Sequence, residues 1–294
     1  MYNKSTDLLE ACKRENILIS EATLRKEIEE SGKNREYFID RFNEVYMVMK
    51  ESSTKGIEKS IQTMSGITGG NGKRLNNYRK TGKALSDDYI LEAMARAFST
   101  LEVNGAMGKI VAAPTAGASG ILPGALVSTQ AKLNLSDDDM VYGLLTASAI
   151  GGIIAMNATI SGAEGGCQAE TGTASAMAAA ALVELNGGTV EESFHAASFA
   201  IINILGLVCD PIAGLVEFPC ALRNASGVTN AIISSDMAMA GVRSIIPFDE
   251  VVESMFSVGN SIPESLRETA LGGLAATPTG SKFCATCAGG CTGV

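Results

Sequence analysis

The sequence predicts an all-α protein, a single helical domain that spans residues 1–294. Alternating apolar and polar residues, the pattern of a half-buried strand, are nearly absent from the chain. Hydrophobic residues make up 46% of the sequence and charged residues only 19%, which favours buried helix over exposed surface. The 32 glycines cluster in four loops between helical patterns, and no internal repeat or low-complexity linker divides the chain.

The first 65 residues are charge-rich and amphipathic, which predicts a pair of surface helices, and residues 1–55 offer a docking surface for a partner. Ser86, followed by two aspartates, and Ser136, followed by three, predict the next helix starts because acidic residues stabilise a helix N-terminus. The segment 140–161 is uncharged and nearly long enough to span a bilayer. It carries polar residues and glycines and lacks flanking Lys or Arg, so we interpret it as a buried central helix that runs into a loop.

Three further helices are predicted in the second half of the chain. SAMAAAALVELNGG is an Ala-rich helix that ends at its two glycines. Thr189 and Glu192 then form a capping box for a helix that continues through FHAASFAIINIL. Asp249 is expected to cap the helix DEVVESMF, and the Cys-rich tail, residues 281–294, is expected to be flexible.

Charge and cysteine content narrow the classes of function. The net charge of −9 disfavours binding to nucleic acid or to an anionic membrane, and favours a small substrate or a protein partner. The start MYNKSTDLLEACKRE has no apolar signal region, so we expect no export and a cytoplasmic location. Seven cysteines in a reducing compartment point toward metal binding or catalysis and away from a disulfide framework.

Three of the cysteines lie in loops around two predicted helices. Cys167 precedes the Ala-rich helix, Cys209 ends the following apolar helix, and Cys220 closes the Pro-containing loop CDPIAGLVEFPC. A helical hairpin brings its two ends together, so these Gly- and Pro-containing loops are expected to converge. Three thiolates in apolar surroundings suit a soft metal or an iron–sulfur cluster. The alternative is that these cysteines are structural and pack as small hydrophobic side chains.

The tail CATCAGGC has the spacing of a metal clip, C-x2-C-x3-C, at Cys284, Cys287 and Cys291. These thiols could provide a fourth ligand to the site above, hold a metal by themselves, or have no role in an unordered terminus. The sequence leaves all three possibilities open.

At these motifs the chain resembles a known family. The stretches SGITGG, EVNGAMGKIVAAPTAGASGILPG, SGAEGGCQAETGTASAMAAAALVELNGG, CDPIAGLVEFPCALRNA and ETALGGLAATPTG are similar to the α-subunit of bacterial iron–sulfur-dependent L-serine dehydratase (L-serine ammonia-lyase). The resemblance implies an all-helical fold and a 4Fe-4S cluster on Cys167, Cys209 and Cys220. It also implies a lyase that deaminates L-serine to pyruvate and ammonia, in serine degradation and gluconeogenesis.

The chain departs from this family in two places. The family's β-domain, with its Ser-Ser-His-type motif, is absent, so a separate β-subunit is expected to supply it in an α–β heterodimer. Single-chain relatives end in a cysteine that can occupy the fourth iron. The corresponding place here, near Gly280 and Ser281, has no cysteine, which leaves the three tail thiols as fourth-ligand candidates.

The expected reaction needs an open iron position and donors for the substrate. An iron that lacks a fourth protein ligand can act as a Lewis acid on the serine hydroxyl while a base removes the Cα proton. Two Gly-rich loops and the residues that flank Cys167 are the substrate-binding candidates: Thr68, Gly69, Gly70, Thr115, Ala116, Gly117, Ser119, Gly120, Glu164 and Gln168. Alternatively, the loops only link helices and the acids only favour a helix N-terminus.

Other residues and other functions stay open at this point. Glu170, Arg223 and Asn224 could orient the cluster or touch the substrate. His195, the only histidine, lies inside a capped helix, so we interpret it as structural, and the catalytic base is unidentified and could lie on the β-subunit. The rival functions are a cysteine desulfidase-like lyase, a non-catalytic iron–sulfur redox sensor, and a scaffold for the β-chain.

Overall fold

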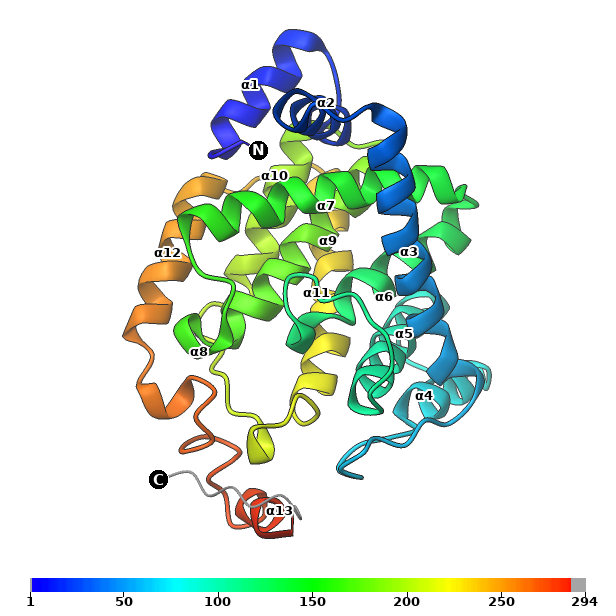
Figure 1. The fold of residues 1–294 in the computed structure, drawn as a ribbon, viewed down its shortest axis with the longest axis vertical. Coiled ribbons are helices and arrows are strands. Elements are labelled where there is room, and N and C mark those ends of the chain that lie inside the picture. Colours follow the sequence, from blue (N-terminus) through cyan, green and yellow to red (C-terminus); the bar gives the residue numbers. More distant parts are fainter. Residues whose placement is uncertain (1, 287–294) are drawn as a thin grey trace.

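The computed structural model describes residues 2–286, and every regular element in that range is a helix, which confirms the all-α prediction (Figure 1). The α-helices are α1 (Ser5–Glu15), α2 (Ile19–Ser31), α3 (Arg35–Glu58), α4 (Asn71–Arg79), α5 (Asp88–Gly105), α6 (Ile121–Leu133), α7 (Asp137–Asn157), α8 (Gly162–Gly165), α9 (Thr173–Leu185), α10 (Val190–Ile202), α11 (Cys220–Met239), α12 (Phe248–Ser261) and α13 (Gly280–Thr286). Short turns of other helix types are η1 (Ala116–Ala118), the π-helical η2 (Gln168–Gly172), η3 (Ile212–Gly214) and η4 (Glu264–Leu266).

The Ala-rich helix α9 lies in the middle of the bundle and packs against α6, α7, α10 and α11 (Figure 1). Every residue from Thr173 to Val183 is buried. A helix that is apolar all round must be covered on all sides, and its alanines let the neighbouring helices approach closely. The predicted Ala-rich helix is therefore the centre of the core.

Helix α7 is the one described helix that is long and apolar enough to cross a membrane, and 67% of its most apolar window is buried inside the protein. It packs against α9, α2 and α3 and ends at Asn157, where a loop follows. These contacts confirm the prediction of a buried central helix that runs into a loop.

The N-terminal region contains three helices, of which α2 and α3 form the predicted pair of surface helices and α1 is one more than the sequence predicted. Asn16 and Gly32 adopt left-handed conformations that end α1 and α2, and periodicity alone does not reveal such breaks. The apolar faces of these helices join the main core through residues such as Leu8, Ile19 and Tyr46. A partner that docks on residues 1–55 would therefore meet their polar outer surface.

The helix caps were mostly predicted correctly. The predicted capping box of Thr189 and Glu192 is present, and the predicted helix start at Ser136 is also a capping box, formed with Asp139. Asp87 caps α5 through the Ile90 N–H, one residue after the predicted serine. Asp249 does not cap α12, because that helix already begins at Phe248. Its carboxylate accepts a hydrogen bond from the Ser5 N–H at 2.9 Å, at the start of α1.

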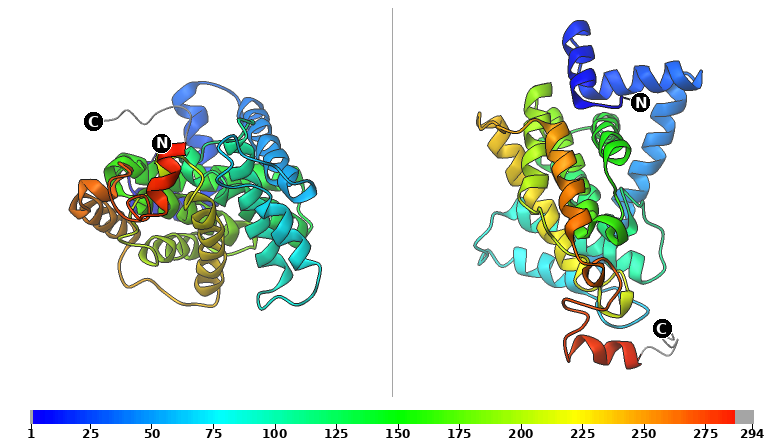
Figure 2. Two further views of the ribbon diagram at one scale, coloured as in Figure 1. Left: turned by 90° about the horizontal axis from the view of Figure 1, so that it is seen from below. Right: turned by 90° about the vertical axis from the view of Figure 1, so that its left-hand side faces the viewer.

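The long loops gather at one end of the molecule. The loop between α10 and α11, the segment between α3 and α4, and α13 all lie away from α1 and α2 (Figure 1, and Figure 2, right). Of the tail cysteines, Cys284 lies in α13, and Cys287 and Cys291 lie outside the described residues.

Candidate functional site

Cys167, Cys209 and Cys220 are all buried free thiols. Cys167 directly precedes the turn η2, and Cys220 is the first residue of α11. Cys209 does not end α10, as the sequence predicted, because that helix stops at Ile202 and the chain turns before reaching the cysteine. The Cys209 main chain is instead fastened to a distant loop, with its N–H 2.8 Å from the Leu266 carbonyl oxygen.

The three thiols are close enough to influence one another's ionisation. Burial, together with the nearby Cys167 and Glu170, raises the pKa of Cys220 to about 12. Burial raises the pKa of Cys209 far above its usual range, and Cys167, Glu170, Glu268 and Cys220 push it in the same direction. Burial also raises the pKa of Cys167, an effect that the Arg223 guanidinium opposes. Burial thus favours the neutral form of each thiol, and each would release its proton on binding a metal.

An ion pair joins the residues that follow two of these cysteines. Arg223 Nη2 donates to Asp210 Oδ1 at 2.6 Å, and both side chains are largely buried. Asp210 Oδ2 accepts a hydrogen bond from the Leu274 N–H at 2.7 Å. A Cβ at Gly273 would lie 2.3 Å from the same oxygen, so only glycine fits there. The pair thus fixes the Cys209 and Cys220 segments against the GGLA loop.

Arg223 keeps one hydrogen-bonding group free. Its Nη1 atom is buried, and among the described residues it has no hydrogen-bond partner. A cavity of about 380 Å³ is lined by Arg223, Thr171 and the residues that follow α10. The Thr171 hydroxyl lies 3.1 Å from Cys167 Sγ. The cavity therefore reaches the immediate neighbours of Cys167.

Glu170 lies where two Gly-rich loops meet Cys209. Its Oε1 accepts a hydrogen bond from the Thr115 hydroxyl, and its Oε2 lies 3.9 Å from Cys209 Sγ. Burial raises the pKa of the Glu170 carboxyl group. A Cβ would lie 2.9 Å from this carboxylate at Gly117 and 2.7 Å from it at Gly162. A larger residue at either position would therefore displace the Glu170 carboxyl group from its place between the loops.

The loop of residues 115–120 is held against α11 by Asn224. The Asn224 side chain accepts from the Gly120 N–H at 2.8 Å and donates to the Gly117 and Cys220 carbonyl oxygens at 2.7 and 2.8 Å. Ser119 donates back to the Ala116 carbonyl oxygen within the loop. The structure thus brings one whole group of predicted substrate residues, Thr115, Ala116, Gly117, Ser119 and Gly120, beside the cysteines.

The second predicted loop reaches the cysteine segment through Thr68. Its N–H and its hydroxyl both donate to Glu217, which lies between Cys209 and Cys220. Gly70 has a φ of 72° and leads directly into α4, while Gly69 has a φ of 148°. Thr68, Gly69 and Gly70 therefore lie next to the loop CDPIAGLVEFPC.

The remaining candidates occupy different surroundings. Gln168 is buried, and its amide is paired at both ends, donating to the Met255 carbonyl oxygen and accepting from the Gly206 N–H, both at 2.9 Å. Glu164 is exposed and accepts from the Thr159 hydroxyl. His195 Nδ1 accepts from the Ser244 N–H at 3.2 Å, which agrees with a structural histidine.

Sequence reasoning did not single out Asp210 or Glu217. Both are buried, and both make several of the contacts that hold the cysteine segment. The available signal was that they are the two charged residues in an otherwise apolar twelve-residue stretch. A buried carboxylate must be paired or hydrogen-bonded, so charge in such a stretch indicates specific contacts.

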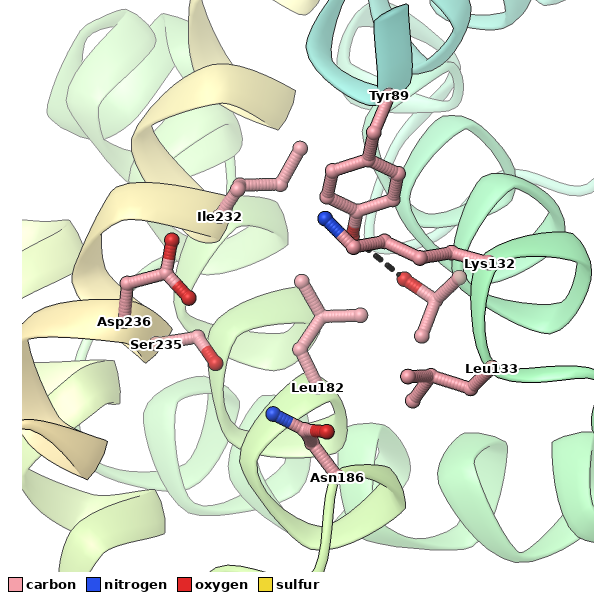
Figure 3. Close-up of a pocket in the computed structure, with 9 residues that line it drawn as sticks. Tyr89, Lys132, Leu133, Leu182, Asn186, Ile232, Ser235 and Asp236 are labelled. Carbon is pink, nitrogen blue, oxygen red and sulfur yellow. Dashed lines mark hydrogen bonds between the residues drawn. The ribbon is translucent and has the colours of Figure 1, made fainter. Parts of the chain in front are cut away.

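A separate small cavity of about 90 Å³ lies at the other end of α9 (Figure 3). Tyr89, Lys132 and Asp236 contribute to its walls, and the Tyr89 hydroxyl lies 2.7 Å from the Thr129 hydroxyl. The Lys132 ammonium lies 4.2 Å from the centre of the Tyr89 ring. Cys167 precedes the N-terminus of α9, whereas Leu182 and Asn186 of this cavity mark its C-terminus, so the two sites are distinct.

Comparisons with known proteins agree on one family. The family model described as serine dehydratase alpha chain matches residues 14–275. The chain is 53% identical over 283 residues to the L-serine dehydratase alpha chain of Peptoniphilus asaccharolyticus, which covers 96% of this chain and 97% of that one. It is 48% identical to the probable L-serine dehydratase alpha chain of Bacillus subtilis, and the match covers 96% of this chain and 94% of that one. It is 37% identical to the L-serine dehydratase of Mycobacterium bovis, but spans only 61% of that longer protein.

Proposed function

Because the chain belongs to the serine dehydratase alpha-chain family, we propose that it is the α-subunit of an iron–sulfur-dependent L-serine dehydratase, a lyase that deaminates L-serine to pyruvate and ammonia. The observation that carries the proposal is the gathering of three buried cysteines, from three separate segments, beside the Gly-rich loops. We expect the enzyme to act in the cytoplasm and to supply pyruvate to gluconeogenesis.

Cys167, Cys209 and Cys220 would hold a 4Fe-4S cluster. Within the described residues no three His, Cys, Asp or Glu side chains are arranged to hold a single metal ion. A four-iron cluster makes a different demand, because each thiolate binds its own iron and the sulfurs need not meet at one point. When bound, the cluster would supply an iron with an open position, a Lewis acid toward the substrate hydroxyl.

The donor set around the cysteines supports this assignment. A buried N–H group without an acceptor is unusual in a folded protein, and Arg223 Nη1 is such a group among the described residues. Its guanidinium already lowers the pKa of Cys167 relative to burial alone, so it favours a thiolate there. A thiolate or sulfide in this site would give the free N–H its acceptor.

The Gly-rich loops would bind and orient the substrate. The loop of residues 115–120 leads into the N-terminus of α6, where main-chain N–H groups favour a carboxylate. The buried Glu170 carboxyl group, with its raised pKa, can hold a proton beside Cys209. Asn224 and Glu217 keep the two loops at fixed places relative to the cysteines.

We propose that a separate β-subunit completes the enzyme. Two relatives that the chain matches over nearly their full length are named alpha chains, and the chain spans only 61% of the longer L-serine dehydratase from Mycobacterium bovis. The missing part is where we expect the catalytic base, since His195 is engaged with Ser244.

The test is anaerobic reconstitution of the α-chain with iron and sulfide, followed by a pyruvate assay with the β-chain present. We expect cluster absorbance and pyruvate formation from serine, with little from cysteine. Cys167→Ala, Cys209→Ala and Cys220→Ala should each abolish the absorbance, whereas Cys12→Ala is the matched control, because Cys12 is equally buried but lies in α1. A complete cluster in all three variants, or preferred turnover of cysteine, would refute the proposal.

A further inference from the structure

We propose that Glu217 is a positioning residue that joins the substrate side of the site to its cysteine side. This inference rests on the proposed function, because it assigns the loop of residues 63–70 to the substrate. Glu217 lies between Cys209 and Cys220, is 6% exposed, and receives four hydrogen bonds from that loop. No motif or residue type in the sequence assigns it this role.

The contacts of Glu217 are concentrated on one short segment. Its Oε2 accepts from the Thr63 hydroxyl at 2.7 Å, from the Thr68 hydroxyl at 2.8 Å and from the Thr68 N–H at 3.2 Å. Its Oε1 accepts from the Ser65 hydroxyl at 2.6 Å. The segment therefore wraps around a single carboxylate.

The fit around this carboxylate is close. A Cβ at Gly105 would lie 2.7 Å from Thr63 Cγ2 and 3.6 Å from Glu217 Cδ. The Met64 N–H also donates to the Gly105 carbonyl oxygen at 2.9 Å. The end of α5 thus backs the segment on one side while Glu217 holds it on the other.

The chemistry of these contacts explains why a carboxylate is needed. Main-chain N–H groups can only donate, and an ionised carboxylate has two oxygens that accept several hydrogen bonds each. Hydrogen bonds to a charged acceptor are stronger than neutral ones, so four of them can fix the position of a loop. Thr68 and the two glycines after it are then presented at a fixed place beside the cysteines.

Two substitutions separate positioning from simple packing. Glu217→Leu keeps the size of the side chain but removes every acceptor. Glu217→Gln can turn its amide oxygen toward the Thr63 and Thr68 donors, and its Nε2 can then donate to the Ser65 hydroxyl oxygen. We expect Glu217→Leu to raise the KM for serine about tenfold in the reconstituted α–β complex, the effect of losing one or two hydrogen bonds, with a smaller change in kcat. Glu217→Gln should restore KM to near the wild-type value.

The energetic coupling between Glu217 and the loop of residues 63–70 can be measured with double variants. Thr68→Val should also raise KM, and the double variant with Glu217→Leu should be no worse than Glu217→Leu alone, because both act through one contact. Thr63→Val combined with Ser65→Ala removes two of the donors to Glu217 and leaves the cysteine segment unaltered. This double variant should also raise KM, and it provides the test if Glu217→Leu does not fold. Glu253→Leu, at an exposed position on α12, is the control and should leave KM unchanged.

A second readout does not depend on activity. Hydrogen exchange of residues 60–70 in the full α-chain should be faster in Glu217→Leu than in Glu217→Gln, while α9 exchanges alike in both. Equal exchange in the two variants, or a fall in kcat with KM unchanged, would overturn the inference. If the wild-type complex fails to deaminate serine, the proposed function falls, but the exchange comparison still tests the role of Glu217.

Discussion

The Glu102 carboxyl group shows how one buried residue can make the stability of the folded state depend on pH. It is fully buried on α5, and its Oε1 accepts hydrogen bonds from the Asn71 and Gly72 N–H groups at the start of α4. Its Oε2 has no hydrogen-bond partner among the described residues. Burial raises the pKa of Glu102 to about 7 from an ordinary 4.5, and the two N–H groups only partly offset that rise.

This raised pKa predicts a stability that falls with rising pH. The folded state binds the Glu102 proton more tightly than the unfolded state. The stabilisation that this proton gives to the folded state is therefore fully present below pH 4.5 and is lost as pH rises through about 7. Glu102→Gln keeps the acceptor oxygen and cannot ionise. We expect the unfolding free energy of the wild type to drop by up to about 3 kcal/mol relative to Glu102→Gln between pH 4.5 and 8.

Denaturant titrations of both proteins at several pH values between 4.5 and 8 would measure this difference. Glu253→Gln, at an exposed position on α12, is the control and should follow the wild type at every pH. A constant difference between wild type and Glu102→Gln across the range would contradict the prediction.

At the scale of elements, carboxylates from distant helices take the place of local caps. Within the described residues, α1, α2 and α4 have no side-chain cap of their own. Asp249 accepts from the first N–H of α1, Glu184 from the first two of α2, and Glu102 from the first two of α4. Each carboxyl oxygen accepts from N–H groups that a helix N-terminus leaves unpaired, so each contact both caps a helix and docks it onto the core.

We predict that Glu184→Ala weakens the attachment of the N-terminal helices. Glu184 ends α9 and accepts from the Ile19 N–H at 3.1 Å, so its loss leaves the start of α2 uncapped. The unfolding free energy should fall by about 1–2 kcal/mol, and amide exchange in α1 and α2 should increase. Glu191→Ala is the matched control, because Glu191 also contacts this region but through an exposed ion pair with Lys13. That pair should contribute less than about 1 kcal/mol, so equal losses in the two variants would argue against a capping role for Glu184.

At the scale of the whole molecule, the cysteine end and the N-terminal end are separated by the length of the bundle (Figure 1, and Figure 2, right). Helix α9 connects them, with Cys167 ahead of η2, the turn that leads into α9, and Glu184 in the last turn of α9. Residues of a partner that complete the reaction must reach the cysteine end. A partner bound only to the outer face of α1 and α2 would not do so.

This arrangement predicts that the reconstituted α-chain alone is a poor catalyst. We expect its rate of pyruvate formation from serine to be at least about a hundredfold below that of the α–β complex, the usual loss when one acid–base group is absent. Cluster absorbance should be similar in both, because the three cysteines proposed to bind the cluster belong to this chain. Serine deamination by the α-chain at the full rate of the complex would contradict it.

The sequence by itself determined those features that depend on neighbours within a few residues. The helix start at Ser136, the capping box at Thr189 and the Ala-rich helix follow from contacts within one or two turns, so a local pattern is enough to predict them. The three cysteine segments and both Gly-rich loops were also found from the sequence, although Asp210 and Glu217, which help to hold them together, were given no role there. The extra helix break at Asn16 was missed because a left-handed residue other than glycine carries a weak signal.

Only the tertiary structure decided which distant groups meet. Asp249 was predicted to cap its own helix, but it contacts Ser5, 244 positions away in the sequence. Glu217 and Thr68 are 149 positions apart, and no periodicity relates them. A carboxylate in an apolar stretch indicates that hydrogen-bond donors surround it in the folded protein, because an unpaired carboxylate in the core is costly. Which donors it finds depends on how the helices pack, and that is a property of the whole core.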